Sequence, residues 1–264
     1  MATQAQGTIA NPADGEIAAH KALASLRYGE GPRVGFLGDT RCGKTEAMKH
    51  FIALYLRAYN GMVLITDDKY AHRAQYDGQL RRDPAQVDSG EAPIDPAGSR
   101  VIVYRGTPAM GARGTLDLEA IARQQWKLAA KRRASLAVYD ELDRACKGGQ
   151  WIQQPSDIGW TFGKGGGDGI GAFWGLQETE SAPREPFNCS THILVVRCAG
   201  NPVRLLKQRG YCEGGADRVI PQLPGDPETP PAQRGYFLLL ARGRPWDGVV
   251  YRFKKRAPVT HAQP

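Results

Sequence analysis

Short apolar runs recur along the chain, and their spacing predicts alternating strands and helices. The runs Arg33–Leu37, Gly61–Asp67, Val101–Arg105 and Leu136–Asp140 have the length of buried strands. Between the first two, apolar residues return at helical spacing and predict a helix over Lys44–Tyr59. Strands that alternate with helices form a mostly parallel sheet covered by helices on both faces. The pattern therefore predicts an α/β fold.

The second half of the chain continues this pattern with shorter connections. A helix is predicted over Asp117–Arg133, and the glycine-dense stretch Gly163–Gly169 reads as a flexible loop or as a mobile element that contacts a ligand or partner. Four more apolar segments follow: Ala172–Leu176, His192–Cys198, Tyr236–Ala241 and Val249–Phe253. Because their connections are short, part of the sheet is expected to be antiparallel.

Composition divides the chain into three regions. Residues 1–28 are expected to be a mobile arm with a short helix, 29–251 the main domain, and 252–264 a basic tail. No run approaches the roughly 18–20 apolar residues of a membrane span, and the N-terminus lacks a signal-peptide pattern. A cytoplasmic protein is therefore expected. The five scattered cysteines then predict reduced thiols.

One motif between the first strand and its helix carries specific chemistry. It has the form G-x-x-x-x-G-K-[ST] and consists of Gly38, Asp39, Thr40, Arg41, Cys42, Gly43, Lys44 and Thr45. In such a loop the backbone N–H groups surround the β-phosphate of a nucleotide, and the helix N-terminus adds its dipole. Lys44 would bind the β- and γ-phosphates and Thr45 would bind Mg²⁺. The motif therefore predicts MgATP as the ligand.

Two later strands end in residues that complete such a site. The strand Leu136–Asp140 closes on Asp140 and Glu141, at the sheet edge where the phosphate loop is expected. Asp140 can bind Mg²⁺, and Glu141 can polarise the attacking water. The strand ending at Leu176 is followed by Gln177, whose amide can sense the γ-phosphate or orient the water. An adjacent Asp-Glu pair favours hydrolysis over transfer to a metabolite.

In this order, these residues resemble the FtsK–HerA superfamily of nucleic-acid-pumping P-loop ATPases, over about residues 30–255. Gly38–Thr45 matches the Walker A loop, and Leu136–Leu142 resembles the Walker B strand. Val63–Lys69 resembles the second strand, and Gly175–Gln177 the sensor strand. The resemblance implies a RecA/ASCE-like P-loop NTPase fold and ATP hydrolysis with Mg²⁺.

Within the superfamily, a compact chain without a membrane segment is most similar to the genome-packaging ATPases of tailless, membrane-containing icosahedral viruses. This resemblance implies a homo-oligomeric ring of five or six subunits that feeds double-stranded DNA into a preformed capsid. Capsid vertex or portal proteins would be its partners, and the host cytoplasm or a virion vertex its location. The family also uses an arginine finger in trans, for which Arg144 is the nearest candidate and Arg184 a second.

A net charge of +8 fits a polyanionic partner, although a basic tail that only aids solubility would produce the same balance. Candidate DNA contacts are basic residues on the glycine-dense stretch and in the tail: Lys164, Arg252, Lys254, Lys255 and Arg256.

Three alternatives to a packaging motor stay open. A cellular or plasmid-borne relative would move DNA, or act in secretion or conjugation, with the same site. A small-molecule kinase would need an arginine-rich lid, which the sequence does not offer. A scaffold that binds ATP without turnover would not need Lys44, Asp140 and Glu141 together.

Overall fold

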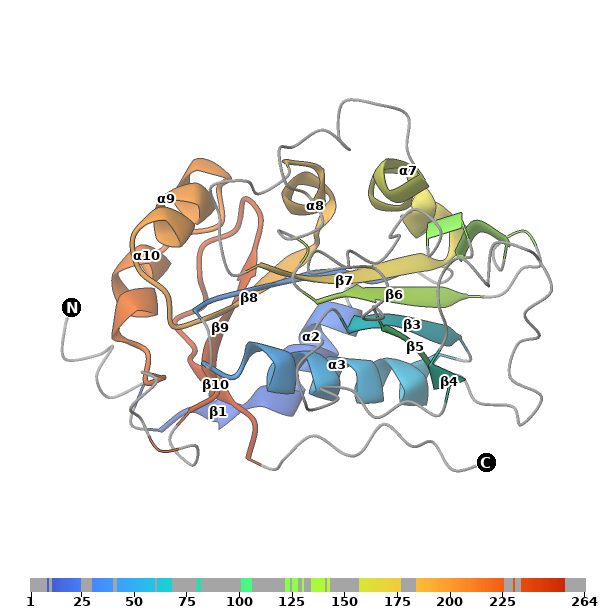
Figure 1. The fold of residues 1–264 in the computed structure, drawn as a ribbon. Coiled ribbons are helices and arrows are strands. Elements are labelled where there is room, and N and C mark those ends of the chain that lie inside the picture. Colours follow the sequence, from blue (N-terminus) through green and yellow to red (C-terminus); the bar gives the residue numbers. More distant parts are fainter. Residues whose placement is uncertain are drawn as a thin grey trace.

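One twisted sheet with helices on both faces forms the body of the protein (Figure 1). The structure is a computed structural model that describes residues 9, 11–24, 30–39, 42–59, 61–67, 80–81, 101–105, 122–123, 125–127, 130, 134–140, 142, 157–176, 184–225, 230 and 234–254. None of the helices in these ranges is long and apolar enough to cross a membrane.

Ten strands in the described residues form a single sheet in the order β1-β10-β9-β8-β2-β7-β6-β3-β5-β4. The seven strands from β8 to β4 are parallel, whereas β9 runs antiparallel to β8, and β10 antiparallel to β9. Both the mostly parallel sheet and its antiparallel part are therefore confirmed. The strands are β1 (Ala13–Asp14), β2 (Arg33–Leu37), β3 (Met62–Asp67), β4 (Leu80–Arg81), β5 (Val101–Arg105), β6 (Ser135–Tyr139), β7 (Ile170–Leu176), β8 (His192–Val196), β9 (Tyr236–Ala241) and β10 (Tyr251–Arg252).

The central strands are apolar because both of their faces are buried. Alternate residues enter two separate cores: Leu64 of β3 packs into one, and Val63 and Ile65 into the other. The first core is covered by α7 (Asp157–Gly163), α8 (Arg184–Cys189), α9 (Asn201–Gln208) and α10 (Ala216–Val219). The second is covered by α2 (Gly15–Ala24) and α3 (Lys44–Ala58), on the opposite side in Figure 1.

Sequence patterns located several elements closely. The predicted strands Arg33–Leu37, Val101–Arg105 and Tyr236–Ala241 have these bounds in the structure. The helix predicted over Lys44–Tyr59 ends one residue earlier, at Ala58. Most of the helix predicted over Asp117–Arg133 lies outside the described residues, so it stays a prediction.

The glycine-dense stretch is not the flexible loop that its composition suggested. Gly163 ends α7, and Gly165–Asp168 forms the 3-10 helix η3, which leads directly into β7. Gly31 N–H donates a hydrogen bond to Gly166 O at 2.8 Å, and a Cβ on Gly166 would lie 2.3 Å from Arg33 Nη2. The missing side chain thus allows η3 to pack closely against the start of β2, a contact that composition alone does not reveal.

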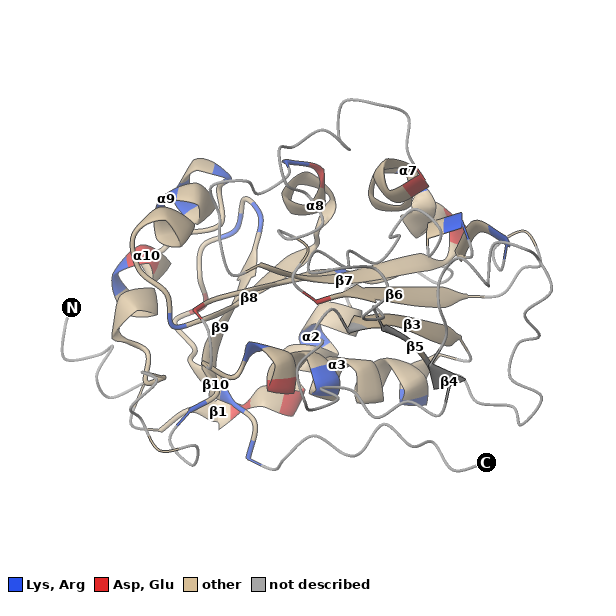
Figure 2. Cartoon of the chain, in the orientation of Figure 1, with Lys and Arg blue, Asp and Glu red and all other residues tan. Residues whose placement is uncertain are grey.

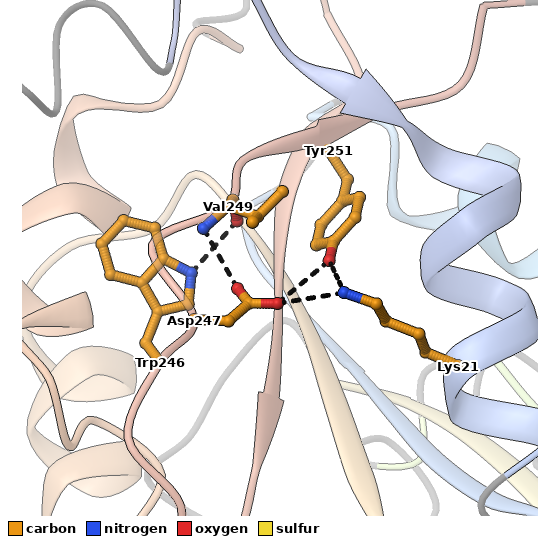
Figure 3. A network of polar contacts seen from close by, with 5 residues as sticks. All are labelled: Lys21, Trp246, Asp247, Val249 and Tyr251. Carbon is orange, nitrogen blue, oxygen red and sulfur yellow. Dashed lines mark hydrogen bonds and ion pairs between the residues drawn. The ribbon is translucent and has the colours of Figure 1, made fainter.

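The two ends of the described chain are joined at one edge of the sheet. β1 pairs with β10, and Lys21 on α2 donates hydrogen bonds to Tyr251 Oη at 2.8 Å and to Asp247 Oδ2 at 3.2 Å (Figure 3). The Phe253 ring stacks on His50 of α3 with centroids 3.8 Å apart. The limits of the three predicted regions stay a prediction, but parts of the first and last regions contact the main sheet.

Candidate nucleotide-binding site

The phosphate loop joins β2 to α3 at the carboxyl edge of the parallel strands. Gly43 directly precedes α3 with a φ of +98°, a backbone angle that favours glycine. Its carbonyl accepts a hydrogen bond from Ala47 N–H at 3.0 Å. The first turn of α3 therefore begins directly at the loop, so its N-terminal amides and dipole point toward any phosphate bound there.

Neighbouring segments enclose the loop on two sides. A Cβ on Gly38 would lie only 2.0 Å from Val196 Cγ2, at the end of β8. Asp39 N–H donates a hydrogen bond to Arg197 O at 3.1 Å, just beyond that strand. A Cβ on Gly43 would lie 2.9 Å from Gly235 Cα, which precedes β9. A side chain at either glycine of the motif would thus collide with a neighbouring segment, at Gly38 with the Val196 side chain and at Gly43 with the backbone of Gly235.

Cys42 anchors the middle of the loop from within. Its side chain is buried, and Sγ donates a hydrogen bond to Gly225 O at 2.7 Å. Gly225 follows the short 3-10 helix η4 (Ile220–Gln222), which lies far along the chain. Cys42, Cys189, Cys198 and Cys212 are free thiols, and Cys146 lies outside the described residues.

Lys44 connects the loop to the strand that carries the predicted sensor. Its side chain is 5% exposed, and Nζ donates a hydrogen bond to Leu176 O, the last residue of β7, at 3.1 Å. Gln177 is the next residue in the sequence. The ammonium group therefore lies at the carboxyl edge of β7, within the region where a triphosphate in the loop would be bound.

Thr45 and Asp140 come together although 95 residues separate them. Thr45 Oγ1 donates a hydrogen bond to Asp140 Oδ2 at 3.4 Å, and Asp140 is 7% exposed directly after β6. A hydroxyl and a carboxylate are oxygen ligands of the kind Mg²⁺ binds. Adjacent ligands at its usual bond length lie about 2.9 Å apart. This pair therefore fits a magnesium ion after a small movement.

Several predicted site residues lie outside the described part of the chain. They are Thr40 and Arg41 of the loop, Glu141, Arg144, Gln177, and Lys255 and Arg256 of the tail. Their roles stay predictions. In the sequence, Glu141 directly follows Asp140 and Gln177 directly follows Leu176. Asp140 and Leu176 both contact residues of the loop.

The described DNA-contact candidates are distributed over different parts of the molecule. Lys164 Nζ lies 4.5 Å from the centroid of the Trp160 ring and precedes the amino end of β7, about 20 Å from its carboxyl edge. The Arg252 guanidinium lies 4.9 Å from the Tyr236 ring, and Lys254 pairs with Asp14 at 3.8 Å. These three candidates therefore do not lie together at one end of the sheet.

Four residues that contact the loop were not predicted from the sequence: Val196, Arg197, Gly225 and Gly235. Two of them contact the loop through backbone carbonyls and one through its own backbone, so no side-chain type marks them. Val196 resembles any other apolar strand residue. Only the positive φ of Gly225 and Gly235 relates to residue type, and glycines are too common in this chain to single them out.

Comparison with solved structures identifies the fold. The chain is similar to the genome-packaging NTPase B204 of Sulfolobus turreted icosahedral virus 2 in complex with ATP-gammaS, with a TM-score of 0.57 and 14% identity over 79% of this chain and 91% of that one. The sulfate complex gives a TM-score of 0.57 and 13% identity over 86% and 98%.

A second virus provides a similar structure. B204, the DNA-packaging ATPase from Sulfolobus turreted icosahedral virus, matches with a TM-score of 0.57 and 16% identity, over 80% of this chain and 92% of that one. The sequence matches no protein-family model and no curated protein sequence. The chain therefore has the fold of the P-loop ATPases, as the motif order predicted.

Proposed function

We propose that this chain is a DNA-translocating ATPase that packages double-stranded viral DNA into a preformed capsid, powered by MgATP hydrolysis. The observation that supports this most directly is the 3.4 Å contact between the Thr45 hydroxyl and the Asp140 carboxylate beside the phosphate loop. This contact brings the two predicted magnesium ligands together at the edge where Lys44 also lies.

The residues of this edge divide the work of hydrolysis. The loop amides and Lys44 bind the β- and γ-phosphates, while Thr45 and Asp140 would hold Mg²⁺. When bound, this ion neutralises charge on the phosphate oxygens. Glu141 orients the attacking water and accepts its proton as the bond between the γ-phosphorus and the bridging oxygen breaks.

Two further residues would complete the reaction. The Gln177 amide follows β7, whose last carbonyl contacts Lys44, and is suited to orient the water against the γ-phosphate. Arg144 of a neighbouring subunit is the proposed finger that stabilises the departing phosphate. Such a finger requires self-association, and the ring of five or six subunits that the family resemblance implies would provide it.

Packaging is favoured over other motor functions by the similar structures. This chain covers 91% and 98% of two B204 structures, which are described as genome-packaging NTPases. Double-stranded DNA and capsid vertex or portal proteins are the proposed partners, in the host cytoplasm or at a virion vertex.

ATP turnover with and without double-stranded DNA tests this function. We expect the purified chain to hydrolyse MgATP, DNA to accelerate it, and the acceleration to fade as salt rises, because phosphate contacts release counterions. Asp140→Asn serves as the inactive control. Turnover that DNA leaves unchanged at low salt would remove the translocase assignment, and turnover that needs a small-molecule acceptor would indicate a kinase.

A further inference from the structure

Positive charge is concentrated in the last third of the described chain. Residues 184–225 and 234–254 contain eleven Lys and Arg against four Asp and Glu, a net charge of +7, whereas the whole chain carries +8. These residues build the sheet edge from β8 to β10 and the helices α8, α9 and α10. Figure 2 shows basic positions along α9 and near α8 on this side of the molecule.

Five of these cations form a surface that we call the α9–β9 basic surface. Arg204 and Lys207 lie three residues apart on α9 and are both exposed, which places them on one side of the helix. Arg209 follows the helix end, and Arg242 and Arg244 lie in the turn after β9.

The turn is fixed against the end of α9 by backbone hydrogen bonds. Gly243 N–H donates to Gly210 O at 2.9 Å, and Trp246 N–H donates to Glu213 O at 2.7 Å. Arg242 and Arg244 flank Gly243, and Arg209 precedes Gly210, so the cations of the two segments are held near each other. Arg242 Nη1 also donates to Asn188 O at 3.2 Å, which orients this side chain.

Acidic residues neutralise this surface only in part. Among the described residues, its single ion pair joins Lys207 Nζ to Asp217 Oδ2 at 3.2 Å, and the Lys207 side chain is 70% exposed. Glu213 and Asp247 are further acids near the turn, and Asp247 pairs with Lys21 at 3.2 Å. Arg204, Arg242 and Arg244 are exposed. Burial lowers the pKa of nearby His192 to about 4, and the positive charge of Arg244 contributes to this shift. The surface thus retains a positive potential.

Within the described residues, the surface also lacks the apolar centre that protein interfaces use. The large exposed hydrophobic residues of the described chain are Ile17 on α2 and Trp160 on α7, which are both on other elements. Protein interfaces usually bury an aromatic or aliphatic core within a polar rim. Arginine, in contrast, matches phosphate oxygens with two parallel hydrogen bonds. These properties favour a nucleic-acid backbone over a protein partner.

We propose that the α9–β9 basic surface binds the phosphate backbone of double-stranded DNA. The proposal rests on the proposed DNA-translocating function and assigns a surface to it. Ala241 pairs with His192 at the amino end of β8, whereas Val196 at the carboxyl end of β8 contacts the phosphate loop. The turn therefore lies about 15 Å along the strands from the nucleotide site. Replacing the charged residues of this surface by neutral ones should therefore leave ATP turnover without DNA unchanged.

Two double variants of the full-length chain test the surface separately: Arg204→Gln with Lys207→Gln, and Arg242→Gln with Arg244→Gln. DNA affinity is measured by fluorescence anisotropy with a labelled random-sequence duplex over a salt series. Each lost phosphate contact lowers the slope of log K against log salt by about 0.9. We expect each pair to reduce the slope by about 1–2 and the affinity at 0.1 M salt by up to about 60-fold.

A matched control removes the same charge elsewhere. Arg57 on α3 and Lys127 are both exposed, and replacing both by Gln should change neither slope nor affinity beyond the small effect of net charge. Each variant must keep DNA-free ATP turnover, which verifies its fold. Since the two pairs lie on different elements, misfolding of one leaves the other informative.

The outcomes separate this proposal from the function on which it rests. If the parent binds DNA and is stimulated by it, but both surface variants behave like the control, the surface assignment is wrong and the translocase function stands. If the parent neither binds duplex DNA nor responds to it, both proposals fail.

Discussion

Lys44 allows the nucleotide site to be tested without knowledge of any partner. Its ammonium group is buried, and it donates to Leu176 O at the edge where the triphosphate is expected. Lys44→Ala removes its hydrogen bonds to the β- and γ-phosphates, each worth about 1.5–3 kcal/mol when a charged group takes part. Loss of two such bonds weakens MgATP binding by about 10²–10⁴-fold.

Thermal unfolding in the presence of MgATP measures this loss directly. A ligand at 100 times its Kd stabilises the folded state by about 2.7 kcal/mol. For a domain of this size, that free energy raises Tm by about 5–10 °C. We expect this rise for the parent chain and essentially none for Lys44→Ala at the same nucleotide concentration.

Arg57→Ala is the matched control, because Arg57 lies on the same helix but is exposed near its far end. This variant should show the full MgATP-dependent rise. If Lys44→Ala retained that rise, with an unchanged Kd by calorimetric titration, the loop would not be the nucleotide site.

Three further predictions follow from particular residues. Glu141→Gln should keep MgATP affinity but lose turnover, since the shape survives and the base does not; normal turnover would exclude Glu141. Gly38→Ala should lower the free energy of unfolding by about 1–3 kcal/mol in urea titrations, because its Cβ meets Val196, while Gly163→Ala, with open space around it, should not. Burial lowers the pKa of His192 in the folded state to about 4, below its value of 6.5 in the unfolded chain. The contribution of His192 to stability is therefore complete above pH 6.5 and is lost as pH falls toward 4, because the unfolded state binds the proton first. In His192→Gln, the loss of unfolding free energy between pH 6.5 and pH 4 should be smaller by up to about 3 kcal/mol. An unchanged pH dependence of unfolding would contradict the burial of His192.

The sequence was most informative where one local pattern dictates the structure. The spacing of Gly38, Gly43, Lys44 and Thr45 predicts a phosphate loop between a strand and a helix, and the motif does lie between β2 and α3. The apolar strand ending at Asp140 could be placed at the same edge because the carboxyl ends of parallel strands meet there. These predictions depend on backbone periodicity and on one motif.

The remaining features depend on contacts between segments that are distant in sequence. The glycines of η3 suggested flexibility, but their lack of side chains lets Gly166 pack against Arg33. Likewise, the carbonyl groups of Arg197 and Gly225 accept hydrogen bonds from the phosphate loop, although these residue types do not predict such a contact. Such backbone contacts become visible only when the strand order is known.

A crystal structure of the chain with Mg²⁺ and a non-hydrolysable ATP analogue would show directly where the nucleotide and its metal ion bind. We expect the triphosphate to lie along Gly38–Thr45 and a magnesium ion to lie about 2.1 Å from Thr45 Oγ1, with Asp140 in its coordination shell. A nucleotide bound elsewhere, or a metal ion remote from Thr45 and Asp140, would contradict it.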